Sequence, residues 1–348
     1  YIDENFQTPV AVATNQKNRQ EDYYLKFKRF KKLPINANYY RSNTITPDVL
    51  GYNSSNTVSL LDKGEVNRDR GSINAEYIDG KLPTVGVSYS FENADYQMLE
   101  RKDDSDTYSL TLNHTAKSRD NIIKSFSAGT SLVKSKIDYS DAQLVSSSGG
   151  YYNSDTTTQN YNFKMTLSPW QGTSIVPSYS LTSADEKRKY FDASGGIESF
   201  KNKKYSKYAS ETASVSTALR LRPWLTPTAS YSVSVKENNN LSRTSYKAND
   251  TTYTFDIGDV KSINRSSEGN VGLSLNGRDM LPKSKLFSAL TLSGSYRLQD
   301  GDAWENVPDS FESLDKLWLR SSMGINSPYS YRSSLTMRDT YSAAMRWS

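Results

Sequence analysis

The single histidine is the first residue to test for catalytic chemistry. His114 is the only histidine among 348 residues, and the chain has no cysteine. A nucleophilic hydrolase needs a histidine with Ser, Asp or Asn partners, and a zinc site needs several His or Cys ligands. His114 continues an alternating apolar series with Leu110 and Leu112, which predicts the apolar face of a strand near a short turn. We therefore predict no enzymatic activity, no metal site and no cofactor.

Two acidic clusters raise the question of calcium, because Ca²⁺ prefers clustered carboxylates. They comprise Asp103, Asp104 and Asp106, and then Asp300, Asp302 and Glu305. Both are expected in connections, where solvated loop charge is the simpler interpretation. No cation is assigned to either.

Basic residues recur on the predicted polar faces of the strands. Such side chains would face a hydrated pore, where they favour anions or an acidic plug, or form ion pairs with lumen carboxylates. The candidates are Lys164, Arg220, Arg222, Arg297, Arg320, Arg332 and Arg338.

The elements that would carry these residues show a strict period of two. In Tyr161–Ser168 the aromatic and aliphatic residues occupy one face, and Asn, Lys, Thr and Ser occupy the other. Pro169-Trp170-Gln171-Gly172 then reverses the chain, because Pro restricts φ and Gly allows a tight turn. A return strand follows through Leu181. The segment around Pro223-Trp224 repeats this design, so the chain is a series of β-hairpins.

The connections between the predicted strands are unequal. Short turns recur at Leu33-Pro34, Leu82-Pro83, Lys117–Asn121, Pro169-Trp170, Pro223-Trp224, Leu281-Pro282 and Pro328. Long polar loops are expected at residues 141–158, 183–209 and 236–268. Short turns at one end and long loops at the other are typical of a transmembrane antiparallel up-and-down β-barrel. We predict about 14–16 strands within residues 21–348, and an irregular segment or weak edge strand within residues 1–20.

Composition agrees with a barrel wall. Only 35% of the residues are hydrophobic and the mean hydropathy is −0.71, yet 25 Tyr and 11 Phe argue against disorder. A sheet with one face on lipid needs apolar residues at only half of its positions. No run approaches the roughly 18 apolar residues of a membrane helix. We expect the outer membrane of a Gram-negative bacterium, with the lipid bilayer and lipopolysaccharide as partners and no nucleic acid.

Aromatic residues near the predicted strand ends are candidates for the membrane–water boundary. They are Trp170, Trp224, Tyr161, Tyr179, Tyr231 and Trp347. A Trp that follows Pro also anchors turns in β-proteins that do not touch membranes, so both interpretations stay open.

The order of turns predicts where the chain ends. The first strand runs into a short turn, and Leu314–Ile325 is expected to pair with Tyr331–Trp347 around Pro328. Both ends would then lie on the side of the long loops, whereas complete bacterial barrels have both ends in the periplasm. We therefore expect an internal segment of a larger barrel.

Three segments resemble the very large translocon barrel of the type 9 secretion system, the SprA family. They are Phe27–Ser42 ("FKRFKKLPINANYYRS"), Tyr77–Asn93 ("YIDGKLPTVGVSYSFEN") and Leu219–Val235 ("LRLRPWLTPTASYSVSV"). The resemblance lies in Ser-Tyr-Ser strands that are joined by Leu-Pro and Pro-Trp turns, and it extends over residues 20–347. It implies a wide protein-conducting pore with plug or gating proteins and a remaining barrel segment as partners.

Three other functions remain open. A porin for small solutes and a barrel that transports lipopolysaccharide or lipid share most of these features. A secreted β-rich surface or adhesion protein would instead bury the apolar face and carry short turns at both ends. The unequal connections favour the membrane barrel.

Overall fold

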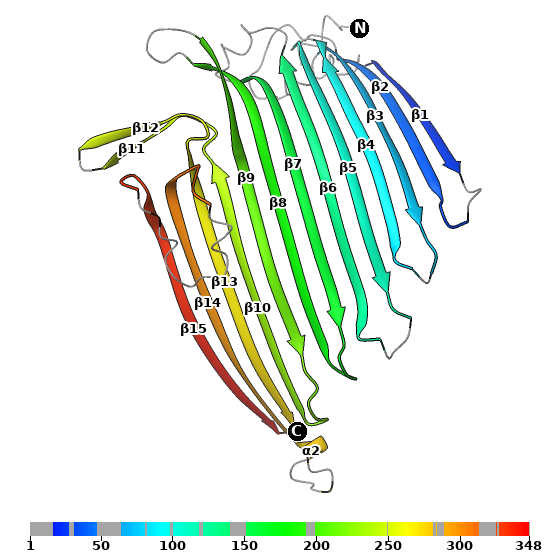
Figure 1. Cartoon of the computed structure of the whole chain (residues 1–348), viewed down its shortest axis with the longest axis vertical. Helices are drawn as coiled ribbons and strands as arrows, with labels where there is room; N and C mark the ends of the chain where they lie inside the picture. The colour runs from blue at the N-terminus through cyan, green and yellow to red at the C-terminus, as the bar shows by residue number, and fades with distance from the viewer. Residues whose placement is uncertain are drawn as a thin grey trace, which may run out of the picture.

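The chain folds into a single broad sheet of long strands (Figure 1). The computed structural model describes residues 17–27, 31–46, 64–80, 82–97, 100–117, 121–139, 151–192, 199–248, 250–280, 283, 289–312, 325 and 327–347. Residues 1–16, which make up most of the segment predicted to be irregular or a weak edge strand, lie outside these ranges. Among the described helices, none is long and apolar enough to cross a membrane.

Thirteen strands pair antiparallel, each with the next one along the chain, apart from one insertion. They are β1 (Lys17–Phe27), β2 (Ile35–Thr46), β3 (Gly64–Tyr77), β4 (Thr84–Tyr96), β5 (Arg101–Thr115), β6 (Ile123–Tyr139), β7 (Tyr151–Leu167), β8 (Ser174–Asp192), β9 (Ser199–Ala218), β10 (Leu225–Asn239), β13 (Val260–Asn276), β14 (Leu290–Pro308) and β15 (Tyr331–Trp347). The insertion is a separate hairpin of β11 (Thr244–Ala248) and β12 (Thr251–Phe255), and a one-turn helix, α2 (Gly277–Met280), follows β13. The predicted antiparallel up-and-down architecture is confirmed.

Register separates the side chains into an apolar face and a polar face. Phe163 on β7 lies opposite Ala128 on β6 and Tyr179 on β8. Its neighbour Asn162 lies opposite Gly129 and, on β8, a serine. Partners in an antiparallel ladder share a face, so the alternation seen within one strand extends across the whole sheet.

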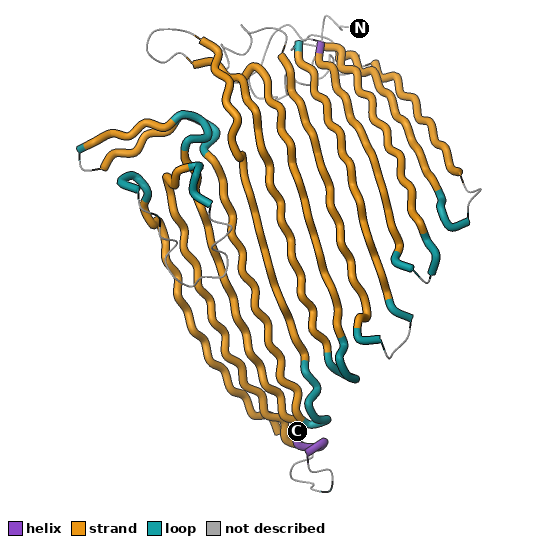
Figure 2. The backbone as a smooth tube through the Cα atoms, viewed as in Figure 1, coloured by secondary structure: helices purple, strands orange, loops and turns teal. Residues whose placement is uncertain are grey.

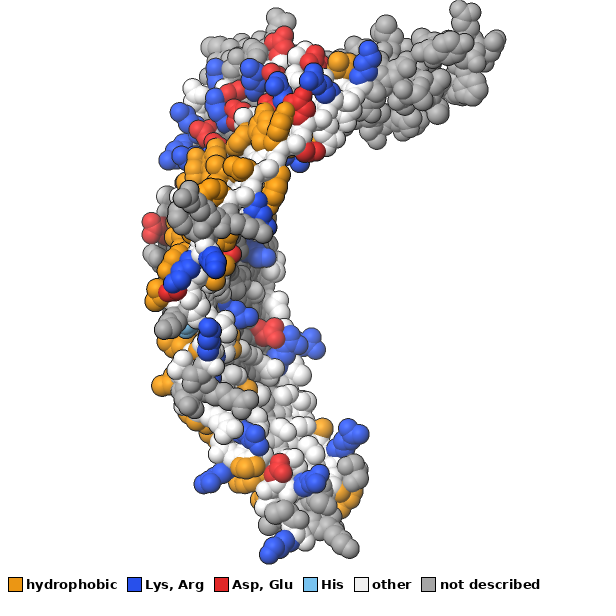
Figure 3. Space-filling view, turned by 90° about the vertical axis from the view of Figure 1, so that its right-hand side faces the viewer, with side chains coloured by type: hydrophobic (Ala, Val, Ile, Leu, Met, Phe, Trp, Pro, Cys, Tyr) orange, Lys and Arg blue, Asp and Glu red, His pale blue; other side chains and the backbone are white. Residues whose placement is uncertain are grey.

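The sheet is curved, and the two faces lie on opposite sides of the curve. In the edge-on view most hydrophobic side chains gather along the convex side, whereas the described atoms on the concave side are mostly neither hydrophobic nor charged (Figure 3). This is the arrangement of a barrel wall with lipid outside and water inside.

Most short turns lie at one end of the sheet, as predicted. The connections after β1, β3, β5, β7, β9 and β13 all lie at the lower end in Figures 1 and 2. We call this end the turn side and the opposite end the loop side. The exception is Pro328, which lies on the loop side between β14 and β15.

The strands extend farther to the loop side than the alternation predicted. β7 begins at Tyr151, so only the first part of the expected 141–158 loop lies outside it. β8 and β9 together occupy most of the expected 183–209 loop, and 236–268 contains strand ends and the β11–β12 hairpin. The physical reason is that both faces there meet water. At these strand ends apolar and polar residues therefore no longer alternate, although the backbone hydrogen bonds between neighbouring strands continue.

The first strand of the predicted final hairpin, Leu314–Ile325, lies outside the described residues apart from Ile325. β15 pairs with β14, from which it is separated by residues 309–330, and residues 313–324 lie outside the described part of the chain. β15 therefore runs from the loop side to the turn side, and its last described residue, Trp347, lies on the turn side (Figure 1). The expectation that both ends lie on the loop side fails at this end.

The buried core of the described residues lies over β10, β13 and β14. Val233, Val235, Ile263 and Val307 are almost fully buried there. Phe311 and Ile325, from the connection between β14 and β15, pack against this group. Over the rest of the described sheet, many large apolar side chains on the convex face are exposed.

Candidate functional site

Hydroxyl and amide side chains lie on the concave face. Ser178 and Ser214 are joined by a 2.6 Å hydrogen bond between their Oγ atoms, and Thr212 donates to Ser234 at 3.0 Å. Gly129 leaves room for Asn162 on the next strand, since a Cβ there would meet its Oδ1 at 2.9 Å. Cross-strand pairs of this kind stabilise the pairing of the strands without placing apolar groups on this face.

Three of the predicted lumen residues lie on this face by register. Lys164 lies opposite Ser127 and Ser178, and Arg338 lies opposite Gln299. Arg297 donates from Nε to Glu268 Oε1 at 2.9 Å. The polar face therefore carries several basic side chains, of which Arg297 is ion-paired.

The other four predicted lumen residues lie elsewhere. Arg220 and Arg222 follow the end of β9, in the turn before β10. The guanidinium of Arg332 stacks over Trp304, 5.0 Å from the ring centroid. Arg320 lies outside the described residues.

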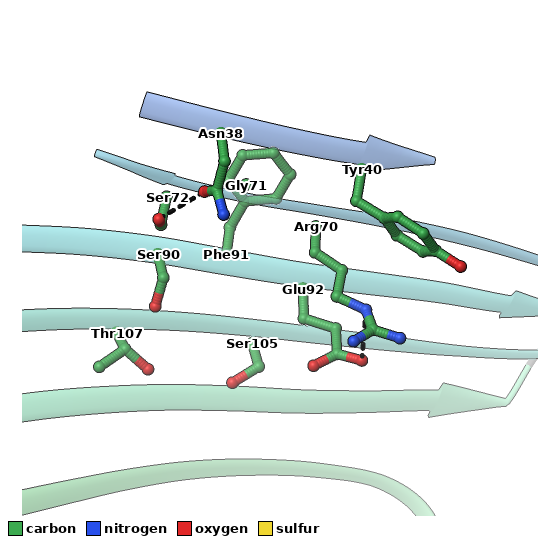
Figure 4. Close-up of a pocket in the computed structure, with 10 residues that line it drawn as sticks. All are labelled: Asn38, Tyr40, Arg70, Gly71, Ser72, Ser90, Phe91, Glu92, Ser105 and Thr107. Carbon is green, nitrogen blue, oxygen red and sulfur yellow. Dashed lines mark hydrogen bonds and ion pairs between the residues drawn. The ribbon is translucent and has the colours of Figure 1, made fainter. Parts of the chain in front are cut away.

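A polar hollow of about 430 Å³ lies on the concave face over β2–β5 (Figure 4). The Arg70 guanidinium lies 5.0 Å from the Tyr40 ring centroid, and its Nε lies 3.7 Å from Glu92 Oε1. The remainder of the hollow is lined by serine and threonine residues together with Asn38, Gly71 and Phe91. Arg70 and Glu92 are both about half exposed, so their charges face solvent.

The aromatic candidates occupy two kinds of position. Tyr161, Tyr179 and Tyr231 share the apolar face through the register of β7–β10. The two turn tryptophans Trp170 and Trp224 lie on the turn side, and Trp347 ends β15. Trp170 donates from its indole nitrogen to the backbone carbonyl of Arg220 at 3.3 Å, so it also ties two turns together.

Tyrosines mark the upper edge of the apolar band, and two of them were missed by the sequence analysis. Tyr39 donates to Asp69 at 2.7 Å, and Tyr89 donates to Asp106 at 2.8 Å. Tyr179 makes the same contact with Glu211. In each case the carboxylate lies diagonally on the next strand, two residues closer to the loop side. An apolar ring with a polar tip is suited to a boundary between lipid and water.

Charged residues of alternating sign follow above this boundary on the convex face. Asp104 lies opposite Lys136, which in turn lies opposite Asp155. Opposite charges on neighbouring strands stabilise a ladder, whereas like charges would weaken it. Lys136 and the hydrogen bond from Asn153 hold the pKa of Asp138 below its ordinary value, against the effect of partial burial.

A buried carboxylate lies on the polar face on the loop side. Glu186 is fully buried and accepts hydrogen bonds from Ser154 at 2.5 Å, Arg188 at 2.9 Å and Tyr205 at 2.9 Å. Lys207 approaches to 3.3 Å. Burial alone would raise the pKa of Glu186, but these donors and cations outweigh it and lower the pKa.

The expected acidic loops are strand segments. Asp103 and Asp104 are neighbours on β5 and so point to opposite faces, and Asp103 forms a 2.6 Å ion pair with Arg101. Asp302 on β14 is buried and binds Arg265 through two 3.1 Å hydrogen bonds. The described residues contain no group of three or more ligands arranged for a metal ion. His114 packs against Phe126 with ring centroids 5.4 Å apart.

Comparison with known proteins concerns the fold. No family model and no curated protein matches the sequence. Solved structures that match include the copper transporter OprC (7% identity, 83% of this chain, 50% of that chain, TM-score 0.41). A second match is the FrpB iron transporter from Neisseria meningitidis (10% identity, 82% of this chain, 54% of that chain, TM-score 0.47). A third is the alcaligin outer membrane receptor FauA from Bordetella pertussis (8% identity, 84% of this chain, 63% of that chain, TM-score 0.34). The chain spans about half the length of the first of these structures.

The fold itself defines the class: an antiparallel up-and-down sheet with one apolar and one polar face, the architecture of a β-barrel wall. Likeness at these identities extends to the architecture and not to a ligand. The resemblance to the type 9 translocon barrel is not shown by these matches and stays a prediction.

Proposed function

We propose that this chain forms part of the wall of a large protein-conducting pore in the outer membrane of a Gram-negative bacterium. The supporting observation is a concave face with cross-strand hydroxyl pairs, such as Ser178–Ser214 and Thr212–Ser234, opposite a convex face on which hydrophobic side chains gather. A passing polypeptide needs a hydrated wall without apolar patches that would retain it. Serine, threonine and asparagine provide such a surface.

The number of strands in the closed ring distinguishes a protein-sized pore from a small-solute porin. Thirteen strands pair in one sheet, and β1 and β15 are not paired with each other. Barrel diameter increases with strand number, so these thirteen strands belong to a protein-sized pore when the closed ring contains many more strands than the roughly 16–18 of a porin. Plug or gating proteins and lipopolysaccharide are the partners that such a pore would need.

The exposed convex face argues against a secreted adhesin. Tyr108, Leu110, Val271 and Met345 are exposed on this face, and no second described sheet covers them. A soluble sandwich would bury such a surface.

The test is conductance of the native assembly in planar lipid bilayers, together with its membrane fraction. We expect a large conductance that falls when a folded substrate domain, stalled on its way through, occupies the pore. A small conductance that excludes polypeptides but passes sugars would favour the porin instead. Recovery of the chain in the soluble fraction would exclude both pores.

A further inference from the structure

The two edge strands of the sheet run in the same direction. Thirteen strands alternate strictly, so β1 and β15 both run from the loop side to the turn side (Figure 1). If β15 and β1 formed backbone hydrogen bonds with each other, they would therefore pair as parallel strands. Bacterial single-chain barrels close with antiparallel neighbours and an even number of strands.

A second copy of this chain does not remove the difficulty. Copies arranged around a pore axis keep the direction of every strand, so β15 of one copy would again meet a parallel β1 of the next. Neither one chain nor a ring of identical chains forms an antiparallel barrel from these thirteen strands.

Both edges need a partner. All seventeen residues of β15 are exposed, as are ten of the eleven residues of β1. On β15 the convex side carries Tyr341 and Met345, which are 76% and 70% exposed. An unpaired strand edge in hydrocarbon costs several kcal/mol for each unsatisfied backbone group. The apolar band thus reaches both edges of the sheet without a described strand to complete it.

We propose that an odd number of further antiparallel strands, of a sequence different from this chain, stands between β15 and β1 in the closed ring. This inference rests on the proposed function as a barrel wall. The strand beside β15 runs from the turn side to the loop side. Its apolar residues lie opposite Tyr341 and Met345, and its small polar residues lie opposite Thr340 and Ser342.

Photo-crosslinking combined with electron cryomicroscopy of the native assembly tests this arrangement. Benzoylphenylalanine replaces Tyr341 on β15, or Leu25 on β1, in the full protein. Met345 provides a second position on β15 if the first variant does not assemble. Phe163, on the convex face of the mid-sheet strand β7, is the matched control because both of its neighbours are strands of this chain.

We expect cross-links from β15 and β1 to peptides that are absent from residues 1–348, and a map with an odd number of strands between the two edges. The Phe163 control should yield only lipid and its own neighbouring strands. Cross-links from β15 to residues 17–27, to residues 1–16 or to no polypeptide would overturn the proposal, as would an even number of intervening strands. A ring closed directly by β15 and β1 that still conducts would overturn this inference and leave the proposed pore intact.

Discussion

The hydroxyl of Tyr179 on β8 donates a 2.8 Å hydrogen bond to the carboxylate of Glu211 on β9. The two residues lie diagonally on the convex face, with Glu211 closer to the loop side. The ring of Tyr179 joins the apolar band, and its hydroxyl reaches the first charged position above that band. This contact marks the loop-side edge of the apolar band on β8 and β9.

Removal of that hydroxyl should destabilise the sheet. We expect Tyr179→Phe to lower the free energy of unfolding by about 1–2 kcal/mol, because Glu211 loses a donor in a partly desolvated position. Denaturant titration in detergent micelles measures the change. Tyr161→Phe is the control, since its hydroxyl makes a 3.3 Å bond with exposed Gln159 and should matter little. Equal effects of the two variants would contradict a special role for the boundary contact.

The buried ion pair on β13 and β14 should be sensitive to the loss of one partner. Asp302→Ala removes the buried carboxylate that Arg265 binds, and we expect a loss of about 3–5 kcal/mol in unfolding free energy. Glu92→Gln breaks the solvent-exposed pair with Arg70 and should cost at most about 1 kcal/mol. Thermal unfolding of both variants in the same detergent makes the comparison. Similar losses would show that burial of Asp302 is unimportant.

Stability on the loop side should decrease in acid through Glu186. Its pKa is lowered from the ordinary value of 4.5, so its contribution is complete above that value and disappears as pH falls through the lower folded pKa. We expect the unfolding temperature of the native chain to fall between about pH 5 and about pH 3. Glu186→Gln should be less stable at neutral pH, with a smaller decrease over the same range. The same acid dependence in both proteins would assign the effect to other carboxylates.

Charge on the concave face should influence ion selectivity. Lys164 lies on the polar face by register, and we expect Lys164→Glu to shift the reversal potential in a salt gradient toward cation selectivity. Lys134→Glu places the same change on the convex face, where Lys134 lies opposite Asp106. It should leave selectivity unchanged. A shift with Lys134→Glu alone would reverse the assignment of the two faces.

The sequence by itself determined the architecture and its two faces. Alternation in segments such as Tyr161–Ser168 is a local property, and a period of two specifies a strand with one apolar side wherever it occurs. The short turns at Pro169-Trp170 and Pro223-Trp224 could be predicted because turn-forming residues are also a local property of the sequence. The absence of catalytic residues was predicted from residue counts and is not tested by the fold.

Only the tertiary structure decided the contacts that join distant segments. Tyr179 and Glu211 meet because of the β8–β9 register, and a change of one residue would turn either side chain to the other face. Burial of Glu186 likewise depends on residues from three strands. The direction of β15 also required the fold, because its alternation is compatible with a partner on either side. Local pattern specifies a strand, whereas pairing in space specifies its neighbour and direction.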